Sequence, residues 1–314
     1  MYTQPMRIVS LLPSATEIVY ALGLGESLVG VTHECDYPPE ARAKPAVTAS
    51  VLDQRADSAL IDRLVAGSVH DHRGIYTLNE RLLRDLAPDL ILTQELCAVC
   101  AVSYAEVQRA ARILPGDTPI VSLEPQTLDD ILGTVTLVGR LTGRNEAATA
   151  LVASLHARIA AVAARAAQAA RRPRVYCMEW IDPPFRAGHW IPEMVRLAGG
   201  VEVLGSEGTP STRATWPEVA AAAPEVIVVM PCGFDVARTA QELHAVRHRP
   251  EWVELRAVAD GRVWITDGSA YFSRPGPRII DGLEILAHAL HPTLFPAPSS
   301  QDLRLLHAES SSDS

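Results

Sequence analysis

Short apolar runs alternate with helical patterns along the first 125 residues. Runs rich in Ile, Val and Leu predict buried strands at residues 8–12, 28–32, 88–93 and 120–123. After Ser14, apolar residues recur at helical spacing until two glycines, which are typical of a helix end. Strands that alternate with helices in this way favour a mainly parallel sheet covered by helices. The pattern therefore predicts an α/β lobe.

The middle of the chain predicts helices. Apolar residues recur at helical spacing from Leu128 to Leu141, and an alanine-rich stretch runs from Glu146 to about Arg171. Alanine is the best helix former, and about 25 residues at 1.5 Å each make a rod of roughly 38 Å. We expect this rod to be a backbone helix that braces two lobes.

The second half repeats the outline of the first. The run 174–180 mirrors 7–12, and a Pro-acid-apolar strand occurs both at 88–92 and at 224–229. The predicted fold is therefore two Rossmann-like α/β lobes with mainly parallel sheets joined by a long backbone helix. We place the N-terminal lobe at 1–125, the helical connector at 126–171 and the C-terminal lobe at 172–296. The Ser-rich, acidic stretch 297–314 is expected to be a disordered tail.

Composition narrows the class of protein. A net charge of −9 and a pI near 5.6, without any Lys/Arg-rich run, argue against a nucleic-acid partner. No run of about 18 apolar residues predicts a membrane span. No signal-peptide pattern precedes Ile8, so the expectation is a cytoplasmic protein with reduced thiols; an exported, periplasmic protein is the alternative. Five cysteines cannot all pair within one chain.

The loop after the strand at 174–180 is the strongest indication of a ligand site. Pro183 and Pro184 stop the strand, since neither can donate to a ladder. The loop then carries Phe185, His189 and Trp190 at a strand end, which is where open α/β sheets bind ligands. The alternative is that these rings pack on their own domain.

Cysteines and a histidine follow strands of the first lobe. His33, Cys35, Cys97 and Cys100 are candidate ligands for a soft metal if they converge at the sheet edge. A single Cys-x-x-Cys is not a sufficient zinc signature. Reduced, buried thiols and a redox pair of Cys97 with Cys100 remain alternatives.

Enzyme signatures are absent from the sequence. Gly-x-Gly-x-x-Gly after a strand, the P-loop, Gly-x-Ser-x-Gly and His-Glu-x-x-His do not occur. We therefore expect a binding protein, not an enzyme. The competing hypothesis is a thiol- or metal-centred redox enzyme that uses Cys35, Cys97 and Cys100.

Several segments in order resemble a known family. They are Arg7–Glu17, Val29–Thr32, Cys35–Pro38, Asp182–Gly200 and Ser273–Arg278. Together with the long connector helix, they are similar to the cobalamin-type, helical-backbone (class III) substrate-binding proteins of ABC importers. The resemblance implies a monomer that holds a corrinoid, such as cobalamin, in a cleft between two lobes. Haem or an iron-siderophore is the alternative ligand, and no cofactor beyond this metal chelate is required.

The resemblance also implies site residues. The expected ligand contacts are Pro13, Ser14, Thr16 and Tyr37 from the first lobe and Phe185, His189, Trp190, Tyr271, Phe272 and Arg274 from the second. Family members dock on a permease through one exposed Glu in each lobe, usually seven residues before the Pro of the Pro-acid-apolar strand. Those places hold Arg81 and Pro217, with Glu80 and Glu218 each displaced by one residue. A permease is therefore a possible partner, through Glu80 and Glu218.

Overall fold

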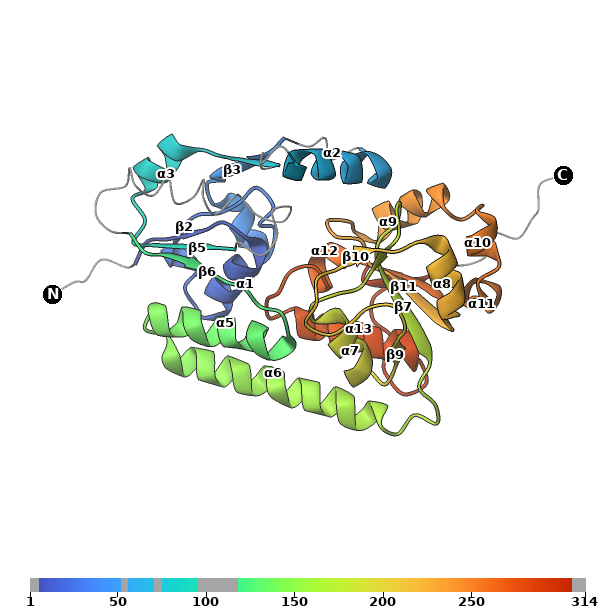
Figure 1. Cartoon of the computed structure of the whole chain (residues 1–314). Helices are drawn as coiled ribbons and strands as arrows, with labels where there is room; N and C mark the ends of the chain where they lie inside the picture. Colours follow the sequence, from blue (N-terminus) through green and yellow to red (C-terminus); the bar gives the residue numbers. More distant parts are fainter. Residues whose placement is uncertain (1–5, 52–55, 71–74, 95–117, 307–314) are drawn as a thin grey trace. The chain divides into compact units, whose positions relative to one another are not determined.

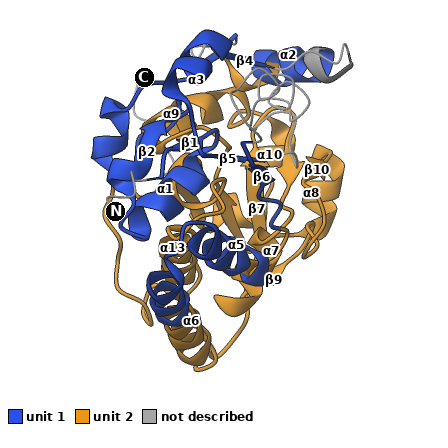
Figure 2. Ribbon diagram, turned by 90° about the vertical axis from the view of Figure 1, so that its left-hand side faces the viewer, with its two compact units in different colours: residues 1–56, 60–125, 129–154 blue, residues 57–59, 126–128, 155–314 orange. Residues whose placement is uncertain are grey.

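The computed structural model describes residues 6–51, 56–70, 75–94 and 118–306. The chain divides into two compact units (Figure 2). Unit 1 comprises residues 1–56, 60–125 and 129–154, and unit 2 comprises residues 57–59, 126–128 and 155–314. The predicted fold class is confirmed, because each unit is a sheet with mainly parallel strands covered by helices.

Unit 1 is built on a four-stranded parallel sheet in the order β2-β1-β5-β6. Its elements are β1 (Ile8–Ser10), α1 (Pro13–Ala21), a 3-10 helix (Gly25–Ser27), β2 (Leu28–Gly30), a 3-10 helix (Pro39–Ala43), β3 (Thr48–Ser50), α2 (Ser58–His70, which begins in unit 2), β4 (Tyr76–Leu78), α3 (Glu80–Leu86), β5 (Leu90–Thr93), β6 (Ile120–Ser122) and α5 (Leu128–Leu141). Strands β3 and β4 form a separate antiparallel pair that the sequence did not predict.

The two faces of this sheet are covered by different helices. Ile8, Leu90 and Leu92 pack with α1, α5 and the start of α6 (Asn145–Ala166). The alternate residues Val9 and Ile91 pack on the other face with Leu83 of α3. Successive strand side chains point to opposite faces, so a strand that is apolar throughout must be covered on both.

Unit 2 is built on a seven-stranded sheet with the path β10-β8-β7-β11-β12-β13 and β9 beside β7. Its elements are β7 (Arg174–Trp180), β8 (Phe185–Arg186), α7 (Ile191–Leu197), β9 (Val201–Glu202), β10 (Thr212–Arg213), α8 (Trp216–Ala222), β11 (Val226–Val229), α9 (Val236–Glu242), a 3-10 helix (Leu243–Ala245), α10 (Pro250–Val253), α11 (Arg256–Ala259), β12 (Val263–Thr266), α12 (Gly268–Tyr271), α13 (Ile279–Leu290) and β13 (Leu303–Leu305). The central strands β7, β11 and β12 are parallel, while β8, β10 and β13 are antiparallel to their neighbours.

Helix α6 is continuous from Asn145 to Ala166, and the boundary between the units falls inside it (Figures 1 and 2). It ends earlier than the predicted Arg171. In unit 2 its Arg158 forms ion pairs with Asp281 and Glu284 of α13. By length and composition alone α6 could cross a membrane, which was not expected from the sequence. One such helix is weak grounds for a span.

In both units an arginine before or at the start of the first strand bonds to the helix that precedes the Pro-acid-apolar strand. In unit 1 the Arg7 guanidinium donates to the Leu86 carbonyl at the end of α3, and the Arg7 N–H donates to Asp89. In unit 2 Arg174 makes the same two contacts. A guanidinium on the last carbonyls of a helix satisfies orphan acceptors and complements the helix dipole. The sequence repeat is thus a repeat of interactions.

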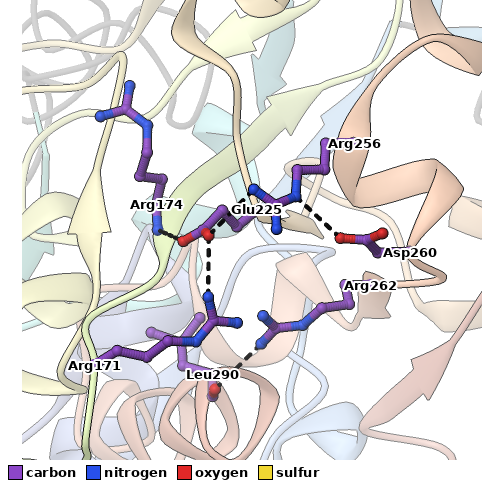
Figure 3. A network of polar contacts seen from close by, with 7 residues as sticks. All are labelled: Arg171, Arg174, Glu225, Arg256, Asp260, Arg262 and Leu290. Carbon is purple, nitrogen blue, oxygen red and sulfur yellow. Dashed lines mark hydrogen bonds and ion pairs between the residues drawn. The ribbon is translucent and has the colours of Figure 1, made fainter.

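In unit 2 the Arg174 contacts belong to a larger basic cluster (Figure 3). Glu225 accepts from the Arg174 N–H at 3.0 Å and forms an ion pair with Arg171 at 3.1 Å. Arg256 lies 3.9 Å from Glu225 and pairs with Asp260 at 3.2 Å. The cluster closes the amino-terminal edge of the sheet, opposite the edge where ligands bind in such folds.

The end of the described chain differs from the expectation. The expectation of a disordered tail from residue 297 is wrong for Leu303–Leu305, which form β13 and pair with β12. The short run Leu-Arg-Leu-Leu lies among polar residues, and a strand of this length needs a partner strand to form.

All five tryptophans of the chain lie within 180–264, and therefore in unit 2.

Candidate ligand-binding surfaces

The carboxyl edge of the unit 2 sheet gathers aromatic side chains that the sequence analysis did not single out. Trp180 ends β7, and Phe234 lies in the loop after β11; their ring centroids are 5.1 Å apart. The Arg238 guanidinium stacks on the Phe234 ring at 3.9 Å. Trp180 and Arg238 are half-buried. Trp180 is the last residue of β7, and Phe234 and Arg238 follow β11. Ligands bind at the carboxyl ends of parallel strands, so the positions of these residues in the sequence could have identified them as candidates.

The predicted loop folds into a two-stranded ribbon, which we call the His189 ribbon and define as residues 184–189 and 208–214. Strands β8 and β10 pair antiparallel within it, and the Ala214 N–H donates to the Pro184 carbonyl. His189 adopts a left-handed backbone conformation with φ 51°. Its N–H donates to the Thr209 carbonyl at 2.6 Å and its carbonyl accepts from the Gly208 N–H at 2.9 Å. The backbone of the ribbon thus fixes His189.

The side chain of His189 is half-buried beside Trp190, with ring centroids 5.5 Å apart. Burial lowers the pKa of His189. The imidazole is therefore neutral at pH 7, where it presents one donor and one acceptor nitrogen.

Two of the expected ligand contacts are corrected by the structure. Trp190 is 6% exposed and Phe272 is 2% exposed, so both belong to the core of unit 2. The Trp190 indole N–H donates to the Phe272 carbonyl at 2.9 Å. A buried indole is satisfied inside the protein in this way. Both residues support the ligand edge from below and do not form its surface.

Three other expected contacts of unit 2 keep some exposed surface. Phe185 begins β8 and accepts at its carbonyl from the Tyr176 hydroxyl at 2.9 Å. Tyr271 donates its hydroxyl to Asp302 at 2.8 Å, and burial and this carboxylate raise its pKa. Arg274 is half-buried in the loop before α13. These three side chains remain candidates for ligand contact.

A carboxyl group lies beneath the His189 ribbon. Glu179 accepts from the Gly188 N–H at 3.0 Å and from the Ser211 hydroxyl, so one carboxyl group contacts both strands of the ribbon. The residue keeps some exposed surface, but its carboxyl group is enclosed by protein. Burial raises the pKa of Glu179 to about 7.

A second enclosed carboxyl group holds the turn after β9. Glu202 accepts from the N–H groups of Val203, Leu204 and Gly205 at 3.1–3.2 Å and from the Cys177 N–H at 3.2 Å. Burial raises the pKa of Glu202 to about 6 in spite of these donors. Its charge also raises the pKa of Glu179.

These two carboxyl groups predict a pH dependence of stability. Their folded pKa values lie above the ordinary value of 4.5, so the folded protein binds more protons than the unfolded chain between about pH 4.5 and 7. The free energy of unfolding that these two carboxyl groups contribute is fully present below about pH 4.5 and is lost as the pH rises through about 6 to 7. Urea denaturation at pH 5, 6 and 7.5 should show wild type losing stability relative to Glu179→Gln over this interval. A constant difference between the two proteins would contradict the prediction.

The expected contacts of unit 1 lie at the amino end of α1 and in the loop after β2. Pro13 is the first residue of α1, and Ser14 and Thr16 are 2% and 0% exposed. The Thr16 hydroxyl bonds to the Ser10 hydroxyl at 2.9 Å and lies 3.0 Å from the Cys35 sulfur. Thr16 is therefore a core residue and not a ligand contact. Tyr37 is 44% exposed and remains a candidate.

The metal hypothesis is only partly covered by the structure. Cys97 and Cys100 lie outside the described residues. Cys35 is buried in the core of unit 1 beside Thr16, and His33 bonds through Nδ1 to the Thr48 hydroxyl at 2.8 Å. Within the described part of the chain, no group of three His, Cys, Asp or Glu side chains could hold a metal ion. The proposed role of Cys97 and Cys100 stays a prediction.

The two candidate docking glutamates differ in their surroundings. Glu80 is exposed at the first position of α3. Glu218 is also exposed, but its carboxylate accepts from the Thr215 N–H and hydroxyl and forms a 3.0 Å ion pair with Arg186. These contacts lower the pKa of Glu218 and occupy its oxygens. Nothing in the structure tests whether either residue meets a permease.

Known proteins similar to this chain were found by sequence and by structure. The chain is 26% identical over 297 residues to the uncharacterized ABC transporter substrate-binding lipoprotein YvrC of Bacillus subtilis, covering 93% of this chain and 82% of that protein. It is 26% identical over 285 residues to the vitamin B12-binding protein of Vibrio cholerae, covering 88% and 86%. A periplasmic haem-binding protein from Pseudomonas aeruginosa has the same fold, with a TM-score of 0.71 at 21% identity over 95% of this chain and 97% of that one.

The family model described as periplasmic binding protein matches residues 8–270. This match covers both units and most of the strands and helices described above. It confirms the resemblance inferred from the sequence motifs. The chain belongs to the periplasmic binding protein family.

Proposed function

We propose that this protein is the substrate-binding component of an ABC importer and that its ligand is a corrinoid. The observation that carries the proposal is the aromatic carboxyl edge of unit 2, formed by the partly exposed side chains of Trp180, Phe185 and Tyr271, with the buried Phe234 ring packed against Trp180. Apolar and aromatic walls with a few polar groups suit a large flat ring system.

The charged groups near this edge favour a corrinoid over an anionic chelate. Arg186 pairs with Glu218, Arg238 stacks on Phe234, and the Arg278 guanidinium lies 5.7 Å from the Tyr271 ring centroid. The Arg186 guanidinium is neutralised by a carboxylate, and those of Arg238 and Arg278 lie over aromatic rings. A corrin ring carries neutral amides around its edge and needs hydrogen-bonding groups more than cations. A haem or ferric siderophore, with ionised oxygens, would need cations available for pairing.

The similarity to binding proteins also supports the class and place of action. The relatives named above are a lipoprotein and a vitamin B12-binding protein, so we propose an extracytoplasmic location in place of the cytoplasmic one. We propose binding without turnover by a monomer that presents Glu80 to the permease. The redox-enzyme alternative loses support because the Cys35 sulfur lies beside Thr16 in the core of unit 1.

Titration with cyanocobalamin, haemin and a ferric siderophore tests the proposal. We expect cyanocobalamin to bind one to one and to be released unchanged. Trp180→Ala removes one large ring, worth about 2 kcal/mol of buried apolar surface, and should weaken binding by about 30-fold. Calorimetry measures the stoichiometry and the affinity, and absorption spectra show whether the ligand is released unchanged. Val253→Ala, on an exposed residue of α10, is the control and should bind like wild type.

Tight binding of haemin with no binding of cyanocobalamin would replace the corrinoid by haem within the same class of protein. Failure of all three chelates to bind would reject the proposed ligand class. An unchanged cyanocobalamin affinity in Trp180→Ala would remove the aromatic edge of unit 2 from the site.

A further inference from the structure

The His189 ribbon depends on backbone contacts that are unusually close. A Cβ atom on Gly188 would lie 2.3 Å from the Ser211 nitrogen and 2.5 Å from the Thr209 oxygen. A Cβ atom on Gly205 would lie 2.3 Å from the Ala187 oxygen. The two strands of the ribbon therefore touch backbone to backbone, and few side chains can hold them together.

Glu179 supplies the side-chain connection. It lies at the carboxyl end of β7, and its two oxygens contact one strand of the ribbon at the Gly188 N–H and the other at the Ser211 hydroxyl. The residue after Gly188 is His189, whose left-handed backbone is held by Gly208 and Thr209. The Glu179 carboxyl group thus adds a side-chain connection next to His189 to the backbone hydrogen bonds and to the Arg186–Arg213 contact that join the two strands.

We propose that Glu179 is a positioning residue of the ligand site: its carboxyl group ties the two strands of the His189 ribbon and so fixes the His189 imidazole at the carboxyl edge of unit 2. The inference rests on the proposed function, because His189 acts as a ligand contact only if this edge binds the chelate. Glu179 itself needs no contact with the ligand.

The protonation state of Glu179 matters for this role. A neutral carboxylic acid accepts from the Gly188 N–H with one oxygen and shares its own proton with the Ser211 hydroxyl through the other. The ionised group has neutral donors, Gly188 and Ser211, and faces the carboxylate of Glu202 from β9. The Tyr176 hydroxyl and Cys177 thiol of β7 are kept neutral by burial and offer no positive charge. The Gly188 N–H and the Ser211 hydroxyl both donate to Glu179 and so favour its ionised form, whereas burial and the charge of Glu202 favour the neutral acid.

Substitutions at Glu179 separate a positioning role from a general structural one. Glutamine has the shape and the donor-acceptor pattern of the neutral acid, with its carbonyl facing Gly188 and its amide N–H facing Ser211. Glu179→Gln should bind cyanocobalamin as wild type does at pH 5.5. Glu179→Ala should weaken binding by about tenfold, because it leaves two buried donors without a partner. Glu254→Gln makes the same change on an exposed glutamate and is the matched control.

The pH profile of cyanocobalamin affinity is the sharper readout. Wild-type affinity should change by up to about tenfold as the pH rises through about 7, where Glu179 ionises and its contacts with Gly188 and Ser211 change in strength. Glu179→Gln should give a flat profile between pH 5.5 and 8.5. An unchanged affinity in Glu179→Ala, or a Glu179→Gln profile that follows wild type, would overturn the proposal.

A ligand-free measurement distinguishes failure of this inference from failure of the proposed function. Hydrogen exchange of the peptide that contains Gly188 and His189 should be faster in Glu179→Ala than in wild type at pH 6, and restored in Glu179→Gln. Unchanged exchange in Glu179→Ala refutes the tie between Glu179 and the ribbon, whatever the ligand. The expected exchange without binding of any chelate would reject the ligand site and, with it, the positioning role, while leaving the tie itself established.

Discussion

Replacing Trp190 by alanine is expected to lower the free energy of unfolding of this protein by about 3–5 kcal/mol, the range measured when large core rings are truncated. Trp190 is 6% exposed and its indole N–H donates to the Phe272 carbonyl. The substitution removes the ring contacts with the core and leaves that buried carbonyl without its donor. Urea denaturation followed by circular dichroism measures the change.

Two further variants locate the origin of that loss. Trp190→Phe keeps an aromatic ring but not the N–H group, so it should cost about 1–3 kcal/mol, for the smaller ring and the unsatisfied carbonyl. Val253→Ala, on a residue that is 55% exposed, should change stability by less than about 0.5 kcal/mol. A loss below about 1 kcal/mol in Trp190→Ala would show that the ring is not part of the core.

Replacing Gly188 by alanine is expected to abolish measurable binding of the chelate, with a loss of at least about 30-fold. The new Cβ would lie 2.3–2.6 Å from backbone atoms of Thr209, Pro210 and Ser211. Backbone atoms cannot rotate away as a flexible side chain can, so the two strands of the His189 ribbon must separate. Overpacking of this kind costs about 1–3 kcal/mol of stability. Calorimetry with cyanocobalamin and urea denaturation measure the two effects.

A matched glycine gives the control for this variant. Gly133 lies inside α5, and a Cβ atom there would meet nothing within 4 Å. Gly133→Ala should therefore stabilise the protein by about 0.5–1 kcal/mol, because alanine is the better helix former, and should leave binding unchanged. Retention of wild-type affinity by Gly188→Ala would mean that the ribbon does not contact the ligand.

The sequence predicts much of the fold because its strands are apolar over their whole length. Ile8 to Ser10 and Val226 to Val229 are buried on both faces of parallel sheets, and such runs stand out from their surroundings. The long helix α6 follows from its alanines. The short strands β8, β10 and β13 carry no such signal, because each contains an arginine. They form only because a neighbouring strand supplies their hydrogen bonds.

The site is less predictable, because burial depends on residues far away in sequence. The loop from Asp182 to Trp190 lies at the carboxyl end of β7 as expected, yet the partner of Trp190 is Phe272, 82 residues later. Sequence alone cannot distinguish a ring that faces a ligand from one that fills the core beneath. Glu179 was missed for the same reason, since it lies in an apolar strand and its role depends on Gly188 and Ser211.

The confinement of all five tryptophans to residues 180–264 gives the protein a built-in optical label for one of its units. Excitation at wavelengths that only indole absorbs would report on unit 2 alone. Emission from Trp180, at the proposed ligand edge, should be quenched by energy transfer to a coloured chelate more strongly than that from Trp252 in the core. Circular dichroism reports on the helices of both units. Comparison of the two signals during unfolding therefore relates the melting of unit 2 to that of the whole chain.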